Sequence, residues 1–263
     1  MIVEVLERLK KEYNHYRSVL VAFSGGTDST LLLALFKKLG KIVAAATVVL
    51  PYLPSRHVEN AKKLAKLIGV PHYLLDGTEI MEVENFKLNP ASRCYMCKKY
   101  IYKVLKDLAK REEMDVIVDG TNFDDLREER PGLKALREES IRTPLADLEL
   151  GKDKVRMLAR QLNLPNWNAP PTTCLLTRLP FGVKITPEKL LRIEKAEEFI
   201  MKILRNDRAA VRVRDYMDIA LIEVSENYLR EIFAEKDRII RELKNISFKK
   251  VALDLEGYRR FKV

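Results

Sequence analysis

Residues 18–39 read SVLVAFSGGTDSTLLLALFKKL, and this stretch decides the fold. The run Ser18–Phe23 is apolar and rich in β-formers, which predicts a short buried strand, and Leu31–Leu39 is helix-like. Between them stands SGGTDST (24–30), with two glycines for a tight turn and several hydroxyl donors. A glycine turn from a buried strand into a helix is typical of α/β proteins that bind an anion at that turn.

Strand-like and helix-like runs alternate through the following part of the chain. They are strand Ile42–Val49, helix Arg56–Ile68, strand Pro71–Leu75, helix Tyr95–Glu112 and strand Asp115–Val118. This alternation predicts an α/β fold with a parallel sheet and helices on both faces. Ligands of such sheets bind at the carboxyl ends of the strands. The turns at Gly25-Gly26 and at Gly120 both follow a predicted strand.

A proline-rich segment, Pro165–Pro187, is too long for an ordinary connector and leads into a smaller part of the chain. There we expect a helix at Glu188–Leu204, a hairpin formed by Ala209–Val213 and Asp218–Val224, a helix at Asn227–Leu243 and a strand at Phe248–Leu255. The sequence therefore predicts two domains. Residues 1–180 form the α/β ligand-binding domain, and residues 181–263 form a small α+β domain for substrate binding or oligomerisation.

Composition narrows the class of protein. The chain has 263 residues, and 48 Lys and Arg against 38 Asp and Glu give a net charge of +10, which suits anionic ligands. No stretch reaches the roughly 18 apolar residues that span a bilayer, and residues 1–17 are too charged for a signal peptide. We therefore expect a cytoplasmic protein without a membrane partner.

The glycine turn predicts a phosphate site. Backbone amides of the turn and the start of the next helix point at one anion, and hydroxyls add donors. The candidate binding residues are Ser24, Gly25, Gly26, Thr27, Asp28, Ser29 and Thr30. Asp28 would repel a phosphate unless a cation lies between them, so we assign it to Mg²⁺. The lysine of a Walker A loop is absent.

A second loop, Asp119-Gly120-Thr121-Asn122, follows another apolar run. Gly120 would allow a close backbone approach, Thr121 adds a donor, and Arg130 could neutralise phosphate. Alone, this sequence is equally well explained as an ordinary turn. Together with the first loop, it predicts a second wall of the phosphate site.

The chain has three cysteines. Cys94 and Cys97 form C-x-x-C at the start of a predicted helix, where the helix end and nearby basic residues favour thiolates. Cys174 lies in the long loop, with Arg178 close by to help keep it ionised. Three thiolates at one place suit a [4Fe-4S] cluster with one open iron. A persulfide or sacrificial cysteine, a zinc site and a disulfide remain as alternatives.

Several motifs in order carry a family resemblance. The loop SGGTDST resembles the PP-loop of ATP pyrophosphatases. With RCYMCK (93–98), DGTNFDDLREERPGLKAL (119–136), CLLTRLPFG (174–182) and VRVRDYMDIALIEV (211–224), the chain resembles the LarE-type sulfur transferases over nearly its whole length. The resemblance implies an adenine nucleotide α-hydrolase-like fold, cleavage of ATP to AMP and pyrophosphate, and a homo-oligomer, typically a hexamer.

The same resemblance implies a substrate and two routes for sulfur. Family members adenylate the carboxylates of pyridinium-3,5-biscarboxylic acid mononucleotide and convert them to thiocarboxylates, the sulfur ligands of a nickel-pincer cofactor. In one branch the cysteine matching Cys174 gives up its sulfur and becomes dehydroalanine. In the other, three cysteines hold a [4Fe-4S] cluster, and Cys94 and Cys97 match its pair.

Substrate contacts are expected from the small domain. Arg212 and Arg214 alternate along a strand, so they face one side and could clamp a substrate phosphate. Glu223, on the partner strand, matches an acidic position of the family. One of Glu194, Glu197 and Glu198 matches another acid of the family, and the spacing does not select among them.

Other functions remain open at this stage. A tRNA thiolase uses a similar loop and would suit the basic charge, but the termini carry no zinc-ribbon C-x-x-C pairs and no RNA module is recognisable. A nucleotide sensor or scaffold would bind ATP without releasing pyrophosphate. An amide-forming or NAD-synthesising PP-loop ligase would have no use for the three cysteines.

Overall fold

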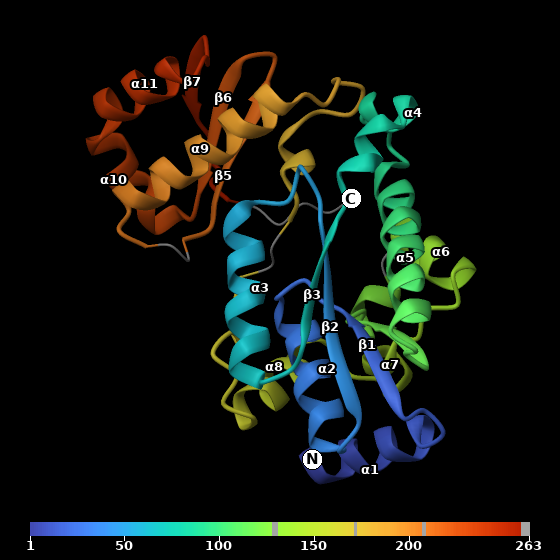
Figure 1. Cartoon of the computed structure of the whole chain (residues 1–263). Helices are drawn as coiled ribbons and strands as arrows, with labels where there is room; N and C mark the ends of the chain where they lie inside the picture. The colour runs from blue at the N-terminus through green and yellow to red at the C-terminus, as the bar shows by residue number, and fades with distance from the viewer. Residues whose placement is uncertain (128–130, 171–172, 207–208, 259–263) are drawn as a thin grey trace. The chain divides into compact units, whose positions relative to one another are not determined.

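The computed structural model describes residues 1–127, 131–170, 173–206 and 209–258 (Figure 1). The chain divides into two compact units. The first consists of Met1–Leu50, Ser55–Ile80 and Ser92–Thr172, and the second of Pro51–Pro54, Met81–Ala91 and Thr173–Val263. The second unit thus takes two short segments from within the first half of the sequence. The predicted domain boundary at residue 180 stays a prediction.

A four-stranded parallel sheet forms the centre of the first unit, with the strand order β3-β2-β1-β4. Its strands are β1 (Ser18–Ala22), β2 (Ile42–Val49), β3 (His72–Asp76) and β4 (Val116–Asp119). β1 pairs with β2 on one side and with β4 on the other. The order in which strands are added to the sheet therefore changes sides at β1. Ligands bind at such a switch point. The loops after β1 and β4 therefore lie side by side.

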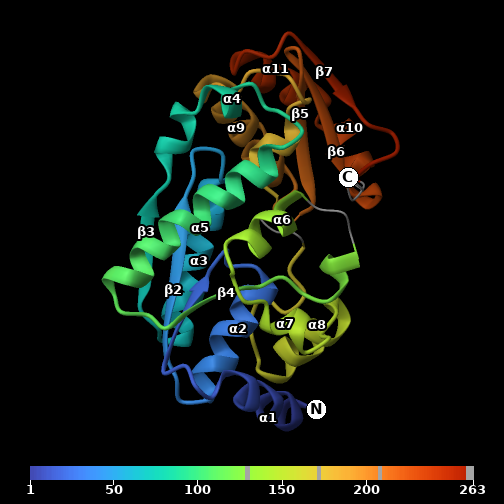
Figure 2. The ribbon, with the colours of Figure 1, turned by 90° about the vertical axis from the view of Figure 1, so that its right-hand side faces the viewer.

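Helices cover both faces of this sheet, as the sequence predicted. They are α1 (Ile2–Tyr13), α2 (Thr27–Lys38), α3 (Ser55–Ile68), α5 (Arg93–Arg111), α6 (Pro131–Glu138), α7 (Pro144–Asp147) and α8 (Lys152–Gln161), with the 3₁₀ turns η1 (Thr78–Glu82) and η2 (Asp124–Arg127). Figure 2 shows α5 crossing one face of the sheet while α3 lies on the other. The α/β fold class is confirmed.

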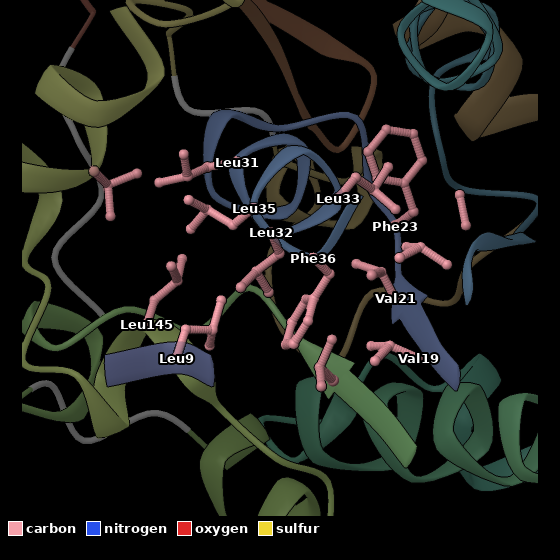
Figure 3. Packing of buried hydrophobic residues seen from close by; sticks show 14 of the residues in the cluster. Leu9, Val19, Val21, Phe23, Leu31, Leu32, Leu33, Leu35, Phe36 and Leu145 are labelled. Atoms are coloured by element: carbon pink, nitrogen blue, oxygen red, sulfur yellow. The ribbon is translucent and has the colours of Figure 1, made fainter. Parts of the chain in front are cut away.

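The core of the first unit is built around α2 (Figure 3). Leu32 and Phe36 are fully buried, together with Leu9 of α1, Val21 of β1 and Leu145 of α7. A helix that is apolar on most of its circumference needs partners on several sides. This burial fixes the axis of α2 and, with it, the position of the helix start that follows the glycine turn.

The second unit is a small α+β structure with a three-stranded sheet of order β5-β6-β7. β5 pairs antiparallel with β6, and β6 pairs parallel with β7. The elements are α4 (Glu84–Lys87), η3 (Leu175–Arg178), α9 (Pro187–Ile203), β5 (Val211–Tyr216), β6 (Ile219–Val224), η4 (Glu226–Tyr228), α10 (Leu229–Ala234), α11 (Lys236–Asn245) and β7 (Lys250–Leu253). Helix α9 packs on β5, and α11 packs on α9 and β7.

The long loop around Cys174 is anchored by the short segments that join this unit. The amide of Leu175 donates to the carbonyl of Tyr52 at 2.9 Å, and the side chain of Asn89 donates to the carbonyl of Pro180 at 2.8 Å. The Tyr52 and Phe86 rings pack 5.5 Å apart, and both are buried. These contacts hold the part of the loop from Leu175 to Pro180 in place.

No helix within the described residues is both long enough and apolar enough to cross a membrane.

Truncation of the core around α2 should destabilise the first unit. We expect Leu32→Ala to lower the free energy of unfolding by about 3 kcal/mol, because it leaves a cavity at a fully buried position. Urea unfolding followed by circular dichroism measures this loss. Lys38→Ala, at an exposed position of the same helix, should change it by no more than about 0.5 kcal/mol. Equal unfolding midpoints for Leu32→Ala and the wild type would contradict this account of the core.

Candidate functional site

The glycine turn after β1 is shaped by its backbone and by a neighbouring helix. Gly25 has φ +73°, a left-handed conformation that favours glycine. A Cβ atom at this position would also lie 3.1 Å from the Cα of Ala61 in α3. Both constraints exclude a side chain there. The turn is therefore held tightly against α3.

The start of α2 has the features of an anion site. Gly26 is the N-cap residue and makes no side-chain cap, so the N-cap residue does not close the first turn of the helix. The Asp28 carboxylate interacts with its own backbone amide. The Thr30 hydroxyl donates to the Gly26 carbonyl at 2.8 Å. The helix end adds a positive partial charge. The predicted phosphate-binding residues thus form one continuous turn.

A residue that the sequence analysis missed also holds this turn. Asn166 is buried, and its side-chain amide donates to the carbonyl of Gly25 at 3.1 Å and to the Thr30 hydroxyl at 3.0 Å. Its own carbonyl accepts from the Thr27 hydroxyl at 2.7 Å. An asparagine in a proline-rich stretch, more than a hundred residues away in sequence, carries no signal that would have identified it.

The loop after β4 borders the first loop, as expected for a second wall. A Cβ atom at Gly120 would lie 2.9 Å from the backbone nitrogen of Ser29, so only glycine allows this approach. Thr121 donates through both its amide and its hydroxyl to Asp119, at 2.9 and 2.6 Å. Thr121 therefore shapes the loop. Arg130 lies outside the described residues.

Asp28 lies where a cation would be favourable. Its carboxylate accepts from the side chain of Asn122 at 2.9 Å. Burial raises the pKa of Asp28 above its usual value, the Asn122 hydrogen bond partly offsets this, and the negative charge of Asp125 adds to it. Lys152 lies 3.2 Å from Asp125. A carboxylate that is partly buried beside another carboxylate fits the donor set of a Mg²⁺ ion.

The C-x-x-C pair lies at the start of α5, in the same unit. Cys94 is exposed and Cys97 is half-buried. The next residue, Lys98, forms an ion pair with Asp119 at 2.8 Å, and Tyr102 donates to the same carboxylate at 3.0 Å. Burial opposes the charge of Lys98, but Asp119 outweighs it and raises the pKa of Lys98. The start of the cysteine helix is thus tied to the end of β4.

The basic neighbours of the pair already have partners. Lys98 is bound to Asp119, and Lys99 lies 3.1 Å from Glu138 of α6. The prediction that basic residues near the pair favour thiolates stays a prediction.

Cys174 belongs to the second unit, whereas the C-x-x-C pair belongs to the first. All three cysteines are among the described residues, and none forms a disulfide. Within residues 1–127, 131–170, 173–206 and 209–258, no three His, Cys, Asp or Glu side chains group as a metal site. The shared three-thiol site stays a prediction.

Arg178 organises the loop that carries Cys174. Its guanidinium makes a two-point contact with Glu197, at 2.7 and 3.1 Å, and donates to the Cys174 carbonyl at 3.1 Å. Burial opposes this charge, but Glu197 and, more weakly, Cys174 raise the pKa of Arg178. Of the three glutamates considered on α9, Glu197 is fully buried and makes this contact.

The hairpin residues lie as the strand pattern predicted. Arg212 pairs in register with Glu223, and Arg214 forms an ion pair with the same carboxylate. Arg214 also donates to the Thr177 carbonyl at 2.9 Å. The Arg212 guanidinium stacks 4.3 Å from the centre of the Tyr258 ring. Both strands therefore direct charged groups to one buried region.

Three buried arginines and two buried glutamates make up what we call the arginine cluster: Arg178, Arg212, Arg214, Glu197 and Glu223. Burial lowers the pKa of Arg212, and the nearby charges of Arg178 and Arg214 add to this effect. Buried guanidinium groups that repel one another are stabilised by an anion. The cluster therefore has the chemistry of a site for phosphate or carboxylate.

Comparison with known proteins agrees with this geometry. Residues 1–142 match the PP-loop domain. The chain is 36% identical to an uncharacterized protein of Synechocystis sp., over 100% of this chain and 98% of that protein. It is 33% identical to the pyridinium-3,5-bisthiocarboxylic acid mononucleotide synthase of Lactiplantibacillus plantarum, over 92% of this chain and 87% of the synthase.

A more distant relative is the tRNA-specific 2-thiouridylase of Syntrophus aciditrophicus, 28% identical over 62% of this chain and 53% of the relative. The match to the synthase extends over both units, whereas this one covers a smaller part of either protein. The chain belongs to the PP-loop family and, within it, to the LarE-type ATP-dependent sulfur transferases.

Proposed function

We propose that this chain activates the carboxylates of pyridinium-3,5-biscarboxylic acid mononucleotide with ATP and replaces their oxygen with sulfur. One observation carries the proposal. In the first unit, the ion pair between Lys98 and Asp119 ties the cysteine helix to the loop whose Gly120 lies against Ser29 of the phosphate turn. This connection supports a site in which nucleotide activation and thiol chemistry share one edge of the sheet.

The first step is adenylation. A bare carboxylate has no adequate leaving group, so the substrate carboxylate attacks the α-phosphorus of ATP and pyrophosphate departs. The amides at the start of α2, from Thr27 to Ser29, stabilise the negative charge that develops on the leaving pyrophosphate. Glycines at 25 and 120 allow backbone, rather than side chains, to approach it.

Magnesium would be held at Asp28, with Asp125 close enough to add to the negative field. When bound, Mg²⁺ neutralises phosphate charge and orients the pyrophosphate for departure. The side chain of Asn122 fixes the orientation of the Asp28 carboxylate by donating to one of its oxygens. This residue set supports Mg·ATP as the form of nucleotide that binds.

The second step exchanges AMP for sulfur. A sulfur nucleophile attacks the acyl carbon of the adenylate, the bond to the phosphate oxygen of AMP breaks, and the thiocarboxylate forms. A [4Fe-4S] cluster held by Cys94, Cys97 and Cys174 would leave one iron open for a sulfide. The i, i+3 spacing of the first pair at an exposed helix start supports this cluster, because both sulfurs lie on one face.

The arginine cluster is the proposed contact for the anionic groups of the substrate. Arg212 and Arg214 supply positive charge from one strand, and Glu223 holds them in place from the next. Arg178 acts on the loop of Cys174 through the Cys174 carbonyl. The family resemblance also supports a homo-oligomer, with a hexamer as the expected state.

The direct test is an anaerobic assay with the biscarboxylic mononucleotide, Mg·ATP and sulfide. We expect stoichiometric AMP and pyrophosphate, together with a product that is heavier by the mass difference of sulfur and oxygen. ATP binding without pyrophosphate release would favour a sensor or scaffold. Thiolation of tRNA, with binding that weakens steeply as salt rises, would favour the tRNA thiolase.

Asp28→Asn should raise the stability of the folded protein and lower its activity. Because the folded-state pKa of Asp28 is raised, its ionised form destabilises the folded protein at neutral pH. The neutral variant should therefore be more stable at pH 7, by about 1.4 kcal/mol for each pKa unit of the shift, and should melt at a higher temperature. This advantage should shrink as the pH falls through the raised pKa. AMP formation should drop roughly 100-fold, because the cation loses its carboxylate.

Thermal melts between pH 4 and 8, compared with AMP formation at pH 7, measure both effects. Asp153→Asn serves as the matched control, since Asp153 is exposed on α8 and should leave activity unchanged. A stability difference that grows as the pH falls would contradict the assignment.

The cysteine pair should be required for iron. We expect anaerobically isolated protein to hold about four iron and four sulfide ions per chain, and the double variant Cys94→Ser/Cys97→Ser to lose them. Iron and sulfide analysis measures this directly, and mass spectrometry of Cys174 after turnover follows the sulfur. An iron-free wild type in which Cys174 becomes dehydroalanine would contradict the cluster and support the sacrificial route.

A further inference from the structure

Asn166 makes three hydrogen bonds to the phosphate turn and is itself 8% exposed. It follows α8 in sequence, far from the turn, and belongs to the same unit. Gly25 presents a carbonyl oxygen, which can only accept, so the side-chain nitrogen of Asn166 must face it. The orientation of the amide is thereby fixed by its partner.

The direction of the carbonyls decides whether this turn can bind an anion. In a trans peptide the C=O and N–H groups point in opposite directions. Turning the Gly25 carbonyl toward Asn166 therefore turns the Gly26 amide to the other side, where it donates to the hydroxyl of Ser24, another residue of the phosphate turn, at 3.3 Å. The next carbonyl, on Gly26, accepts from the hydroxyls of Thr30 at 2.8 Å and Ser29 at 3.2 Å. Both carbonyls are held by donors of the protein.

Two adjacent glycines make it easy for the peptide between them to rotate out of this orientation. Glycine reaches positive and negative φ about equally well, so the Gly25–Gly26 peptide could rotate and present its carbonyl to the ligand. An anion would be repelled by that oxygen. The hydrogen bond of Asn166 to Gly25, at 3.1 Å, opposes the rotation, and a longer one from Asn60 of α3, at 3.4 Å, adds to it. Asn166 also donates to Thr30, the residue whose hydroxyl holds the Gly26 carbonyl.

The carbonyl oxygen of the Asn166 side chain shows that the fold uses this amide as a donor and not as an acceptor. Its Oδ1 atom is buried and has no hydrogen-bond partner within the described residues. A buried acceptor without a partner is unfavourable. The donor end, in contrast, is fully used. The position therefore requires a donor, and an aspartate of the same size would not serve.

We propose that Asn166 is a positioning residue for the ATP-dependent step, which keeps the Gly25–Gly26 peptide turned so that its amide faces the phosphate chain. This inference rests on the proposed use of ATP by the turn. Asn166 acts through the loop and touches no reacting atom. The ligand feature that depends on it is the pyrophosphate part of ATP, since that part requires the amides.

Asn166→Asp and Asn166→Ala test the proposal by equilibrium binding of Mg·ATP and of inorganic pyrophosphate. We expect both probes to bind at least tenfold more weakly to either variant. In steady-state assays the KM for ATP should rise by a similar factor, while the KM for the carboxylate substrate stays within twofold. A general loss of structure would raise both KM values. Asn168→Ala, at an exposed position two residues on, should match the wild type.

A second comparison keeps the proposal testable if the alanine variant folds poorly. Thr30→Val removes the hydroxyl that accepts from Asn166 and donates to Gly26. If both residues act through the same peptides, the double variant Asn166→Asp/Thr30→Val should bind pyrophosphate no more weakly than the weaker single variant. If the losses of pyrophosphate affinity in the two single variants add fully in the double variant, a shared mechanism is refuted.

The outcomes separate this inference from the proposed function. A wild-type protein that fails to bind Mg·ATP would refute the use of ATP. Wild-type binding together with unchanged affinity in Asn166→Asp would refute the role of Asn166 and leave the sulfur transfer intact.

Discussion

The helix start at the end of the first strand must stay open, and the rest of the first unit is arranged around that need. The N-cap residue Gly26 has no side chain with which to close the start of α2. Three other parts of the chain hold the turn from outside: Ala61 packs against Gly25, Gly120 approaches Ser29, and Asn166 binds the Gly25 carbonyl. Burial of α2 in the core keeps the axis of the helix constant. These contacts hold the open helix end in place.

Buried charged side chains have a different structural role in each unit. In the first, the ion pair of Lys98 with Asp119 is satisfied further by Tyr102, and it joins a helix to a strand end. In the second, the arginine cluster contains more positive than negative side chains, and burial lowers the pKa of Arg212. A balanced buried pair mainly fixes geometry, whereas an unbalanced group favours a ligand of opposite charge.

Short-range patterns predicted the fold well. The apolar run Ser18–Phe23, the glycine turn and the alternation of elements gave the parallel sheet, and alternation of Arg212 and Arg214 placed both on one face of β5. Contacts between distant residues were not predictable in the same way. Asn166 has no periodicity to mark it, and the partners of Lys98 and Lys99 depend on how α5 packs against β4 and α6. Spacing reveals which residues share an element, and packing decides which of them meet.

The interleaving of the two units has a consequence for how the polypeptide matures. Tyr52 and Phe86 are synthesised early, yet they are buried in a unit whose remaining residues begin at Thr173. Until that later part leaves the ribosome, these two aromatic rings lack the rest of their unit and are open to non-native association. A fragment that ended at the break between the units would keep this exposure permanently. The segment that begins at Thr173 is therefore needed to shield apolar side chains made much earlier in synthesis.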